Sequence, residues 1–385
     1  MLKGIKVLDL SRLLPGPFCS MLLSDLGCEV LKVEEPDRGD YVRELYPSLF
    51  ETVNRNKKSL TLNLKDEEAR KIFYELCKET DVIIESFRPG VTGRLKIDYS
   101  TIREINPKIV YCSLSGYGQD GPYKDLPGHD INYLGVAGVL AISGDPQGPP
   151  SETTIFPIAD LSNSLFAAIS IISALFSVRV NNNEGEYIDI SIIDSVTALM
   201  GPSTAEYIGT GRPSKEKLMK RSGYEVFKTK NDKFISLACL EDKFFLKLCD
   251  ALGLEAIAHD PRFSSLEGRN QSYKQINEQI AKVLIDHDFE YWFEHLARFD
   301  IPCAPVYRSL DEIFEDRHLQ FRGIFEFIEG TKSQIPQFLF HAKFSGTAIK
   351  TKSPAPSLGQ HTEEILLGLG YPDGEIGKFR EEKII

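Results

Sequence analysis

Three titratable side chains stand at predicted helix starts, a placement suited to proton transfer. His129 follows Gly128 and opens a helical pattern, so its imidazole could move a proton near neutral pH beside backbone amides that bind an oxyanion. Asp160 comes just before a long apolar helix and could serve as a base or a nucleophile. Glu241 is placed similarly, before a helix in the second half of the chain.

Each of these three residues also has a structural interpretation. His129 could be a structural histidine near a helix cap. Asp160 is expected to act as an N-cap that accepts hydrogen bonds from free amides, a role that is compatible with catalysis. Glu241 taken alone would be a surface cap. The residue types therefore leave both interpretations open.

Basic residues crowd the first hundred positions although the chain is acidic overall. With 45 Lys+Arg against 56 Asp+Glu, the net charge is -11, which argues against nucleic acid as a partner. An anionic ligand must then be held by local cations at the ends of strands, where α/β sheets bind ligands. The basic residues in this region are Arg38, Arg43, Arg55, Lys57, Lys58, Lys65, Arg88 and Arg94.

One glycine motif resembles a dinucleotide site only formally. Residues 116–121 read Gly-Tyr-Gly-Gln-Asp-Gly, a GxGxxG pattern that follows a predicted strand. A dinucleotide site needs a helix start that meets the pyrophosphate, but Pro122 and Pro127-Gly128 predict that the chain continues as a loop. We interpret the motif as a loop.

The elements that must position these residues alternate along the first half of the chain. Short apolar runs at 5–10, 30–33, 60–64, 82–85 and 109–115 alternate with helical patterns. This alternation is typical of βαβ units and predicts an α/β fold with a parallel sheet. The apolar stretch at 160–180 contains several serines and predicts a buried helix, with no membrane partner.

The second half of the chain has a different pattern. Residues 201–224 are rich in Gly, Pro, Ser and Lys and predict a linker. A predicted hairpin at 224–238 is followed by helical patterns, which indicates a smaller α+β domain over 225–330.

Cysteine usage indicates a reducing compartment. Seven cysteines without a CxxC pair favour neither a disulfide framework nor a zinc site, so we expect reduced thiols, a cytoplasmic location and no bound metal. The first residues also lack the apolar stretch of a signal peptide.

Several motifs together resemble the class III CoA-transferase (CaiB/BaiF) superfamily over nearly the whole chain. The resemblance implies a Rossmann-like large domain over 1–200 and 331–385, a small domain over 225–330, and two chains interlocked as a homodimer. It also implies an acyl-CoA thioester substrate, with coenzyme A as part of the substrate and no separate cofactor. The motifs are Val7-Leu8-Asp9-Leu10, Pro15-Gly16-Pro17-Phe18, Asp25-Leu26-Gly27-Cys28, Asn54-Arg55-Asn56-Lys57, Phe87-Arg88-Pro89-Gly90, Leu114-Ser115-Gly116-Tyr117 and Leu358-Gly359-Gln360-His361.

The resemblance also implies which residues bind coenzyme A. Because Glu35 stands where several members have an arginine, phosphate contact is expected to pass to Arg38 or Arg43. The residues expected to bind coenzyme A are Arg38, Leu62, Lys65, Ser86, Phe87, Arg88, Arg94, Gly128, Asp130 and Tyr133.

Within the superfamily, the segments at 128–134, 158–160 and 240–245 are similar to those of α-methylacyl-CoA racemases. The resemblance implies that His129, supported by Glu241, and Asp160 exchange the α-proton of a 2-methylacyl-CoA on opposite faces, while amides near 128–130 stabilise the enolate oxygen. The alternative is a CoA-transferase in which Asp160 forms a covalent acyl-enzyme.

Overall fold

The computed structural model describes residues 1–385 except 152–155, 328–334, 350 and 352. The chain divides into two compact units. The first comprises Met1–Val139, Thr154–Gly201 and Gly323–Ile385, and the second comprises Leu140–Thr153 and Pro202–Arg322. The C-terminal segment thus belongs to the same unit as the N-terminal half.

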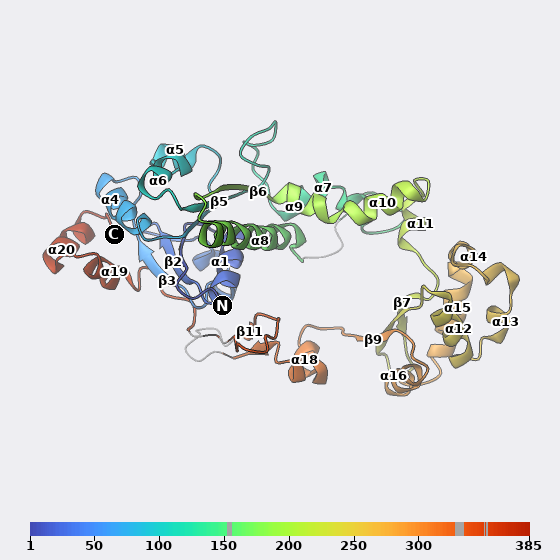
Figure 1. Cartoon of the computed structure of the whole chain (residues 1–385). Helices are drawn as coiled ribbons and strands as arrows, with labels where there is room; N and C mark the ends of the chain where they lie inside the picture. The colour runs from blue at the N-terminus through green and yellow to red at the C-terminus, as the bar shows by residue number, and fades with distance from the viewer. Residues whose placement is uncertain (152–155, 328–334, 350, 352) are drawn as a thin grey trace. The chain divides into compact units, whose positions relative to one another are not determined.

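A six-stranded parallel sheet forms the centre of the first unit (Figure 1). The strand order is β3-β2-β1-β4-β5-β6, and every neighbouring pair is parallel. From β1 the chain adds strands toward one edge of the sheet, and from β4 it adds them toward the other edge, as in Rossmann-like folds. The predicted α/β class is confirmed. The strands are β1 (Lys6–Asp9), β2 (Glu29–Glu34), β3 (Lys58–Thr61), β4 (Val82–Glu85), β5 (Val110–Ser115) and β6 (Tyr187–Ser191).

Helices cover both faces of this sheet (Figure 1). On one face Val7 packs in a cluster with Ala167 of the helix α8, and α1 belongs to the same cluster. On the other face Leu8 packs in a cluster with Phe73 of α4 and Phe379 of α20. The remaining elements of the first unit are α1 (Pro15–Asp25), α2 (Val42–Leu45), α3 (Pro47–Val53), α4 (Glu67–Cys77), α5 (Val91–Leu95), α6 (Tyr99–Ile105), α7 (Asp130–Val136), α8 (Ile158–Asn181), α9 (Ile192–Leu199), β10 (Phe325–Glu326), β11 (Gln337–Phe338), α19 (Thr362–Gly368) and α20 (Asp373–Glu381). The 3-10 helix η1 (Val139–Ile142) begins at the last residue of this unit's first segment, and its other residues belong to the second unit.

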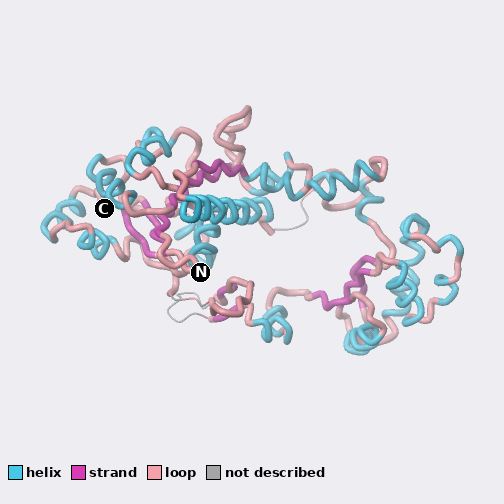
Figure 2. The backbone as a smooth tube through the Cα atoms, viewed as in Figure 1, coloured by secondary structure: helices cyan, strands magenta, loops and turns pink. Residues whose placement is uncertain are grey.

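The second unit contains a three-stranded antiparallel sheet in the order β7-β8-β9, with helices packed around it (Figure 2). Its strands are β7 (Tyr224–Lys228), β8 (Phe234–Ala238) and β9 (Cys303–Val306), and its helices are α10 (Gly201–Gly209), α11 (Lys215–Met219), α12 (Asp242–Ala251), α13 (Glu255–Ala258), η2 (Pro261–Phe263), α14 (Leu266–Gln271), α15 (Tyr273–Leu284), α16 (Phe289–Arg298), α17 (Glu312–Glu315) and α18 (Arg317–Arg322).

The segment 201–224 was expected to be a linker, but it contains the helices α10 and α11. Its composition allows this because Pro202 falls in the first turn of α10, where a missing amide costs nothing. Ser214 caps α11 by accepting a hydrogen bond from the amide of Lys217. Gly and Pro in this segment therefore mark helix ends.

Among the described residues, α8 alone is long and apolar enough to cross a membrane by length and composition. One of its faces packs in the sheet cluster through Ala167, Ile171 and Leu175. The predicted buried helix is thus confirmed for that face, while Leu165 and Ile169 on the other face are 49% and 61% exposed.

A buried network of charges lies at the carboxyl end of β1. The Asp9 carboxylate accepts from Lys57 Nζ at 3.0 Å and from Ser20 Oγ at 2.5 Å. Lys32 Nζ lies 3.1 Å from Asp40 Oδ2, and both side chains are buried. Burial alone would raise the pKa of Asp9, but the charges of Lys57 and Lys32 hold it below its ordinary value.

We expect Lys57→Met to lower the free energy of unfolding by about 3–5 kcal/mol at pH 7, because it leaves the Asp9 carboxylate buried without its closest cation. The deficit should shrink as the pH falls toward 4. Protonation begins to remove the unpaired charge in the variant, whereas the wild type keeps Asp9 ionised and loses the stability from its depressed Asp9 pKa only below the ordinary pKa of an aspartate. Urea unfolding measures both effects.

The matched control is Lys71→Met, because Lys71 pairs with Glu68 on the exposed surface of α4. That variant should unfold like the wild type. Equal behaviour of the two variants would show that the Asp9–Lys57 pair contributes nothing to stability.

Candidate active site

The carboxylate of Asp130 joins two helix starts. Asp130 is the first residue of α7, and its Oδ1 accepts hydrogen bonds from the amides of Ala159 at 2.9 Å and Asp160 at 3.0 Å. These two amides belong to the first turn of α8 and have no partner within the helix. The hydrogen bonds bring the segment that carries His129 beside the segment that carries Asp160.

Asp160 was expected to be the N-cap of its helix, and this prediction is wrong. The helix α8 begins at Ile158, and Asp160 is the third residue of its first turn. Asp130 supplies the carboxylate that satisfies the free amides, so the Asp160 side chain is not needed for capping. Burial raises the pKa of Asp160 to about 7, and the charge of Asp130 adds to this rise.

A carboxyl group with a pKa near 7 exists in both protonation states at neutral pH. It can therefore accept a proton in one step and return it in another.

His129 is exposed and forms the N-cap of α7. Its own amide donates to Asn132 Oδ1 at 2.9 Å, so among the amides near 128–130 that were expected to stabilise an enolate oxygen this one already has a partner. The exposed imidazole remains open to a substrate. The structural interpretation of His129 and the catalytic one are therefore compatible, since the residue both caps α7 and is exposed.

Tyr133 explains why glycines stand at positions 116 and 128. A Cβ added to Gly128 would come within 2.8 Å of the Tyr133 ring, and one added to Gly116 within 2.5 Å of its hydroxyl. The ring also contacts Tyr117 edge to face, with ring centres 5.2 Å apart. Tyr133 is buried, and the contact locks the loop before α7 in place.

The glycine motif at 116–121 lies in a loop, as predicted. No helix begins between the end of β5 and Asp130, and the segment is drawn as loop in Figure 2. The pattern thus serves close packing against Tyr133 at Gly116, with no helix start for a pyrophosphate.

The loop between β1 and α1 is tied to the start of α8. Ser164 Oγ donates to the Pro15 carbonyl at 2.7 Å and to the Asp160 carbonyl at 3.0 Å. In the same loop Leu13 has a positive φ of 65° and donates its amide to Asp40 Oδ1 at 3.2 Å. A non-glycine residue in this region of φ costs free energy, so the buried Asp40 is what holds it there. The loop is thereby fixed beside Asp160.

Of the residues expected to bind coenzyme A, two lie in a well-anchored turn. Ser86 Oγ accepts from the Arg12 amide at 3.0 Å, and the Phe87 amide donates to Glu85 Oε2 at 2.7 Å. The Arg12 guanidinium also lies 5.6 Å from the centre of the Phe87 ring. This turn follows β4, at the carboxyl edge of the sheet, where parallel sheets bind ligands.

The exposed cations among the expected binding residues are Arg38, Lys65, Arg88 and Arg94. Leu62 is buried in the cluster beneath the sheet, so its side chain is a core residue and only its backbone could face a ligand.

Three further basic residues of the first hundred positions, which were candidates to hold an anionic ligand, form ion pairs with carboxylates inside the protein. Arg55 is buried and makes a two-pronged contact with Asp25, at 3.2 and 2.6 Å. Arg43 pairs in the same way with Glu34, at 2.8 and 2.7 Å. Lys57 is the buried partner of Asp9. Charge pattern alone could not distinguish these structural cations from exposed ones, because the distinction depends on burial.

Glu241 lies in the second unit. It is the N-cap of α12, its side chain makes no capping hydrogen bond, and it is exposed. The turn that carries it is held by the buried Arg269, which donates to the Leu240 carbonyl at 3.1 Å and to Asp242 Oδ1 at 2.6 Å. The support that Glu241 was expected to give His129 stays a prediction.

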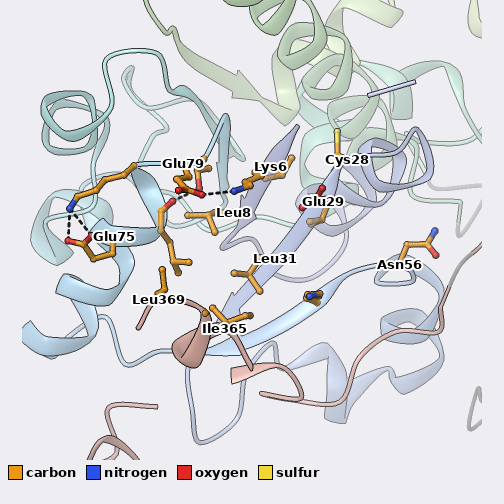
Figure 3. Close-up of a pocket in the computed structure, with 17 residues that line it drawn as sticks. Lys6, Leu8, Cys28, Glu29, Leu31, Asn56, Glu75, Glu79, Ile365 and Leu369 are labelled. Atoms are coloured by element: carbon orange, nitrogen blue, oxygen red, sulfur yellow. Dashed lines mark hydrogen bonds and ion pairs between the residues drawn. The ribbon is translucent and has the colours of Figure 1, made fainter. Parts of the chain in front are cut away.

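A cavity of about 740 Å³ lies at the opposite edge of the sheet, beside the first residues of β1, β2 and β3 (Figure 3). None of the expected site residues lines it. Its lysines are paired with acids, as Lys6 is with Glu79 at 2.7 Å and Lys78 with Glu75 at 2.6 Å. An anionic ligand would find no free cation at these two positions.

Sequence reasoning missed Glu85. This residue ends the apolar run of β4, is buried, and holds the turn expected to bind coenzyme A. The signal that could have found it is an acid directly after Val82-Ile83-Ile84 in a predicted central strand, since a buried acid there requires a partner.

Three comparisons bear on this chain as a whole. The family model described as CoA-transferase family III matches residues 2–362. The succinate–glutarate CoA-transferase of Agrobacterium fabrum is 31% identical over 96% of this chain and 95% of that protein. Human α-methylacyl-CoA racemase is 30% identical over 100% of this chain and 97% of that protein. A crystal structure of a CAIB/BAIF family protein from Brucella suis has a TM-score of 0.83 at 28% identity and covers 96% of this chain and 99% of that one.

We expect Asp130→Asn to lower the pKa of Asp160, because the substitution removes the negative charge that adds to the rise while it keeps an oxygen acceptor for the α8 amides. Carboxyl-carbon NMR of labelled aspartate, followed against pH, measures this pKa. Asp130→Ala should in addition lower the free energy of unfolding by about 1 kcal/mol through loss of the cap.

Asp66 provides the control, since its carboxylate caps α4 by accepting from the Glu68 amide at 2.8 Å. Asp66→Asn should leave the Asp160 titration unchanged. An Asp160 pKa that is the same in Asp130→Asn and the wild type would contradict the electrostatic coupling of the two carboxyl groups.

Proposed function

The chain belongs to CoA-transferase family III, and from that premise we propose that it is a 2-methylacyl-CoA racemase that moves the α-proton through an enolate. The observation that carries this proposal is the pairing of two proton-transfer groups in one unit. Asp130 links the segment of the exposed His129 to that of Asp160, whose pKa is raised to about 7.

Racemisation needs a group that removes the α-proton on one face and a group that returns a proton on the other. The pKa of Asp160 is raised to about 7, so its carboxyl group can accept or return a proton near neutral pH, and an imidazole such as that of His129 is the side chain suited to the opposite role. In one direction the imidazole takes the proton and the protonated Asp160 supplies one to the opposite face, and in the other direction the roles are reversed. Each group contributes about a hundred- to ten-thousand-fold to the rate.

The coenzyme A portion would lie along the carboxyl edge of the sheet. The turn after β4 carries the exposed Arg88, and Arg94 follows in α5. Guanidinium groups bind phosphates through paired hydrogen bonds, so these two residues are the proposed phosphate ligands. No separate cofactor is part of this proposal.

The second candidate is transfer of coenzyme A between carboxylic acids. Several of the relatives carry transferase names, including the one from Agrobacterium fabrum. In this reaction the Asp160 carboxylate attacks the thioester carbonyl and releases coenzyme A as the thiolate, which leaves an acyl anhydride on Asp160. The thiolate then attacks the aspartyl carbonyl, releases the acyl group as its acid and forms an aspartyl thioester, from which an acceptor acid takes coenzyme A in the reverse order.

The proposal includes a homodimer. The face of α8 that does not pack on the sheet presents Leu165, Ile169, Phe176 and Val180, at 49%, 61%, 62% and 62% exposed. An exposed apolar row of this kind on a core helix supports association with a second chain.

A cytoplasmic location also belongs to the proposal. It is supported by seven free cysteines, six of them buried, and activity found only in another cell fraction would contradict it.

One experiment separates the two activities. The enzyme is incubated with a 2-methylacyl-CoA in deuterated buffer, with and without a panel of free carboxylic acids, and both substrate and protein are weighed by mass spectrometry. We expect one deuterium to enter the α-position without any acid present. His129→Ala should slow this exchange at least about a hundredfold.

His259→Ala, which removes an exposed histidine of the second unit, is the matched control and should exchange like the wild type. A new CoA ester that requires an added acid, together with an adduct on Asp160 and no α-exchange, would establish the transferase instead.

For the dimer, sedimentation velocity should give a mass of two chains for the wild type. Ile169→Glu should shift the distribution toward one chain, because a charge on the apolar row disfavours its burial. Lys71→Met on the exposed face of α4 serves as the control. Sedimentation of the wild type as a single chain at micromolar concentration would refute the dimer.

A further inference from the structure

Glu85 is a buried carboxyl group without a role in the proposed reaction. It is the last residue of β4, pairs in register with Ser113 of β5, and is 2% exposed. Its Oε2 accepts the amide of Phe87, two residues ahead, at 2.7 Å. A carboxylate that accepts from a backbone amide two residues later fixes the course of the chain in that turn.

The same turn is held from a second side by the loop after β1. The Arg12 amide donates to Ser86 Oγ at 3.0 Å, and its guanidinium lies 5.6 Å from the centre of the Phe87 ring. Residues 86 and 87 are therefore each anchored. Arg88 follows directly and is exposed, so the two anchors determine where its guanidinium can reach.

We propose that Glu85 is a positioning residue for coenzyme A: its carboxylate fixes the turn 86–88 so that Arg88 meets a phosphate of the ligand. This inference rests on the proposed function, because it takes coenzyme A as the ligand of that turn. It adds that the binding strength depends on the ionisation of a group that the ligand does not touch. A protonated Glu85 holds the Phe87 amide more weakly, since a neutral acceptor forms a weaker hydrogen bond than a charged one.

The surroundings of Glu85 shift its pKa toward neutral pH, so that its ionisation changes between pH 6 and pH 8. Burial raises the pKa of Glu85 to about 7, against hydrogen bonds from Ser113 and the Phe87 amide, and the charge of Asp189 on β6 adds to the rise. The other titratable groups that interact with it on the sheet are Tyr111, Cys112 and Tyr187, whose pKa values are raised, so all three stay neutral near pH 7.

The test compares free coenzyme A binding by calorimetry to the wild type and to Glu85→Gln at pH 8 and pH 6. The amide oxygen of glutamine can still accept from Phe87 but carries no charge. We expect the Kd of Glu85→Gln to exceed that of the wild type about fivefold at pH 8, because a charge-assisted hydrogen bond is about twice as strong as a neutral one. At pH 6 the ratio should approach one, since the wild-type carboxyl is then also neutral.

Because the two proteins are compared at the same pH, titration of groups other than Glu85 does not affect the ratio of their Kd values. The phosphate monoester of coenzyme A loses its second proton near about pH 6, and Asp160 titrates in the same range, but both occur equally in the two proteins. Glu104→Gln, an exposed acid on α6, is the control and should give a ratio of one at both pH values.

A separate measurement excludes a folding defect as the cause. Because the pKa of Glu85 is raised in the folded state, the wild type loses stability as the pH rises from about 4.5 through 7, whereas Glu85→Gln does not. In urea unfolding the variant should therefore gain stability relative to the wild type between pH 5 and pH 8, while it binds coenzyme A more weakly at the higher pH.

The outcomes distinguish this inference from the proposed function. Failure of the wild type to bind coenzyme A, or unchanged binding in Arg88→Ala, would overturn the assignment of the coenzyme A site and with it this inference. If the wild type binds and Arg88→Ala binds more weakly, but the Glu85→Gln ratio is one at pH 8 or the same at both pH values, the site stands and Glu85 has no positioning role.

Discussion

Burial of the central sheet on both faces is the constraint from which the rest of the first unit follows. Helices on both sides exclude water, so each polar group at the strand ends must find a partner inside the protein. Asp9 meets this requirement with Lys57, and Glu85 meets it with the amide of Phe87. The loops that leave the carboxyl edge therefore start from fixed hydrogen bonds, which is what a ligand site on loops needs.

The same requirement shapes the candidate active site. The first turn of α8 has amides without partners in the helix, and Asp130 satisfies two of them from another helix. This arrangement has a consequence for chemistry: two carboxyl groups lie close together in a half-buried place, and their mutual repulsion with burial raises the pKa of Asp160. A contact that stabilises the fold thus also raises the pKa of the carboxyl group on which the proposed proton transfer depends.

The placement of charge reconciles an acidic protein with an anionic ligand. Several basic residues of the first hundred are committed to buried acids, as Arg55 is to Asp25 and Arg43 to Glu34. Exposed guanidinium groups remain at Arg88 and Arg94, near the carboxyl edge of the sheet. The net charge of -11 acts at long range and is screened by salt, whereas phosphate binding depends on a few cations at short range.

The sequence by itself determined the α/β class, the first five strands of the parallel sheet, a long apolar helix predicted at 160–180 and the loop character of residues 116–121. These features depend on local periodicity and on breakers such as Pro122, which act over a few residues. It also named His129 and Asp160, through their place before helical patterns and through family resemblance.

Only the tertiary structure decided which charges are buried and which residue caps which helix. Asp130 caps α8 although it lies 29 positions before Ala159 in the sequence. The prediction that Asp160 is the N-cap was wrong because it considered only residues next to the helix in the chain. Arg55 and Leu62 were grouped with ligand-binding residues because their burial depends on segments far away in sequence. Hydrogen bonding and desolvation act through space, so they become visible only when the chain has folded.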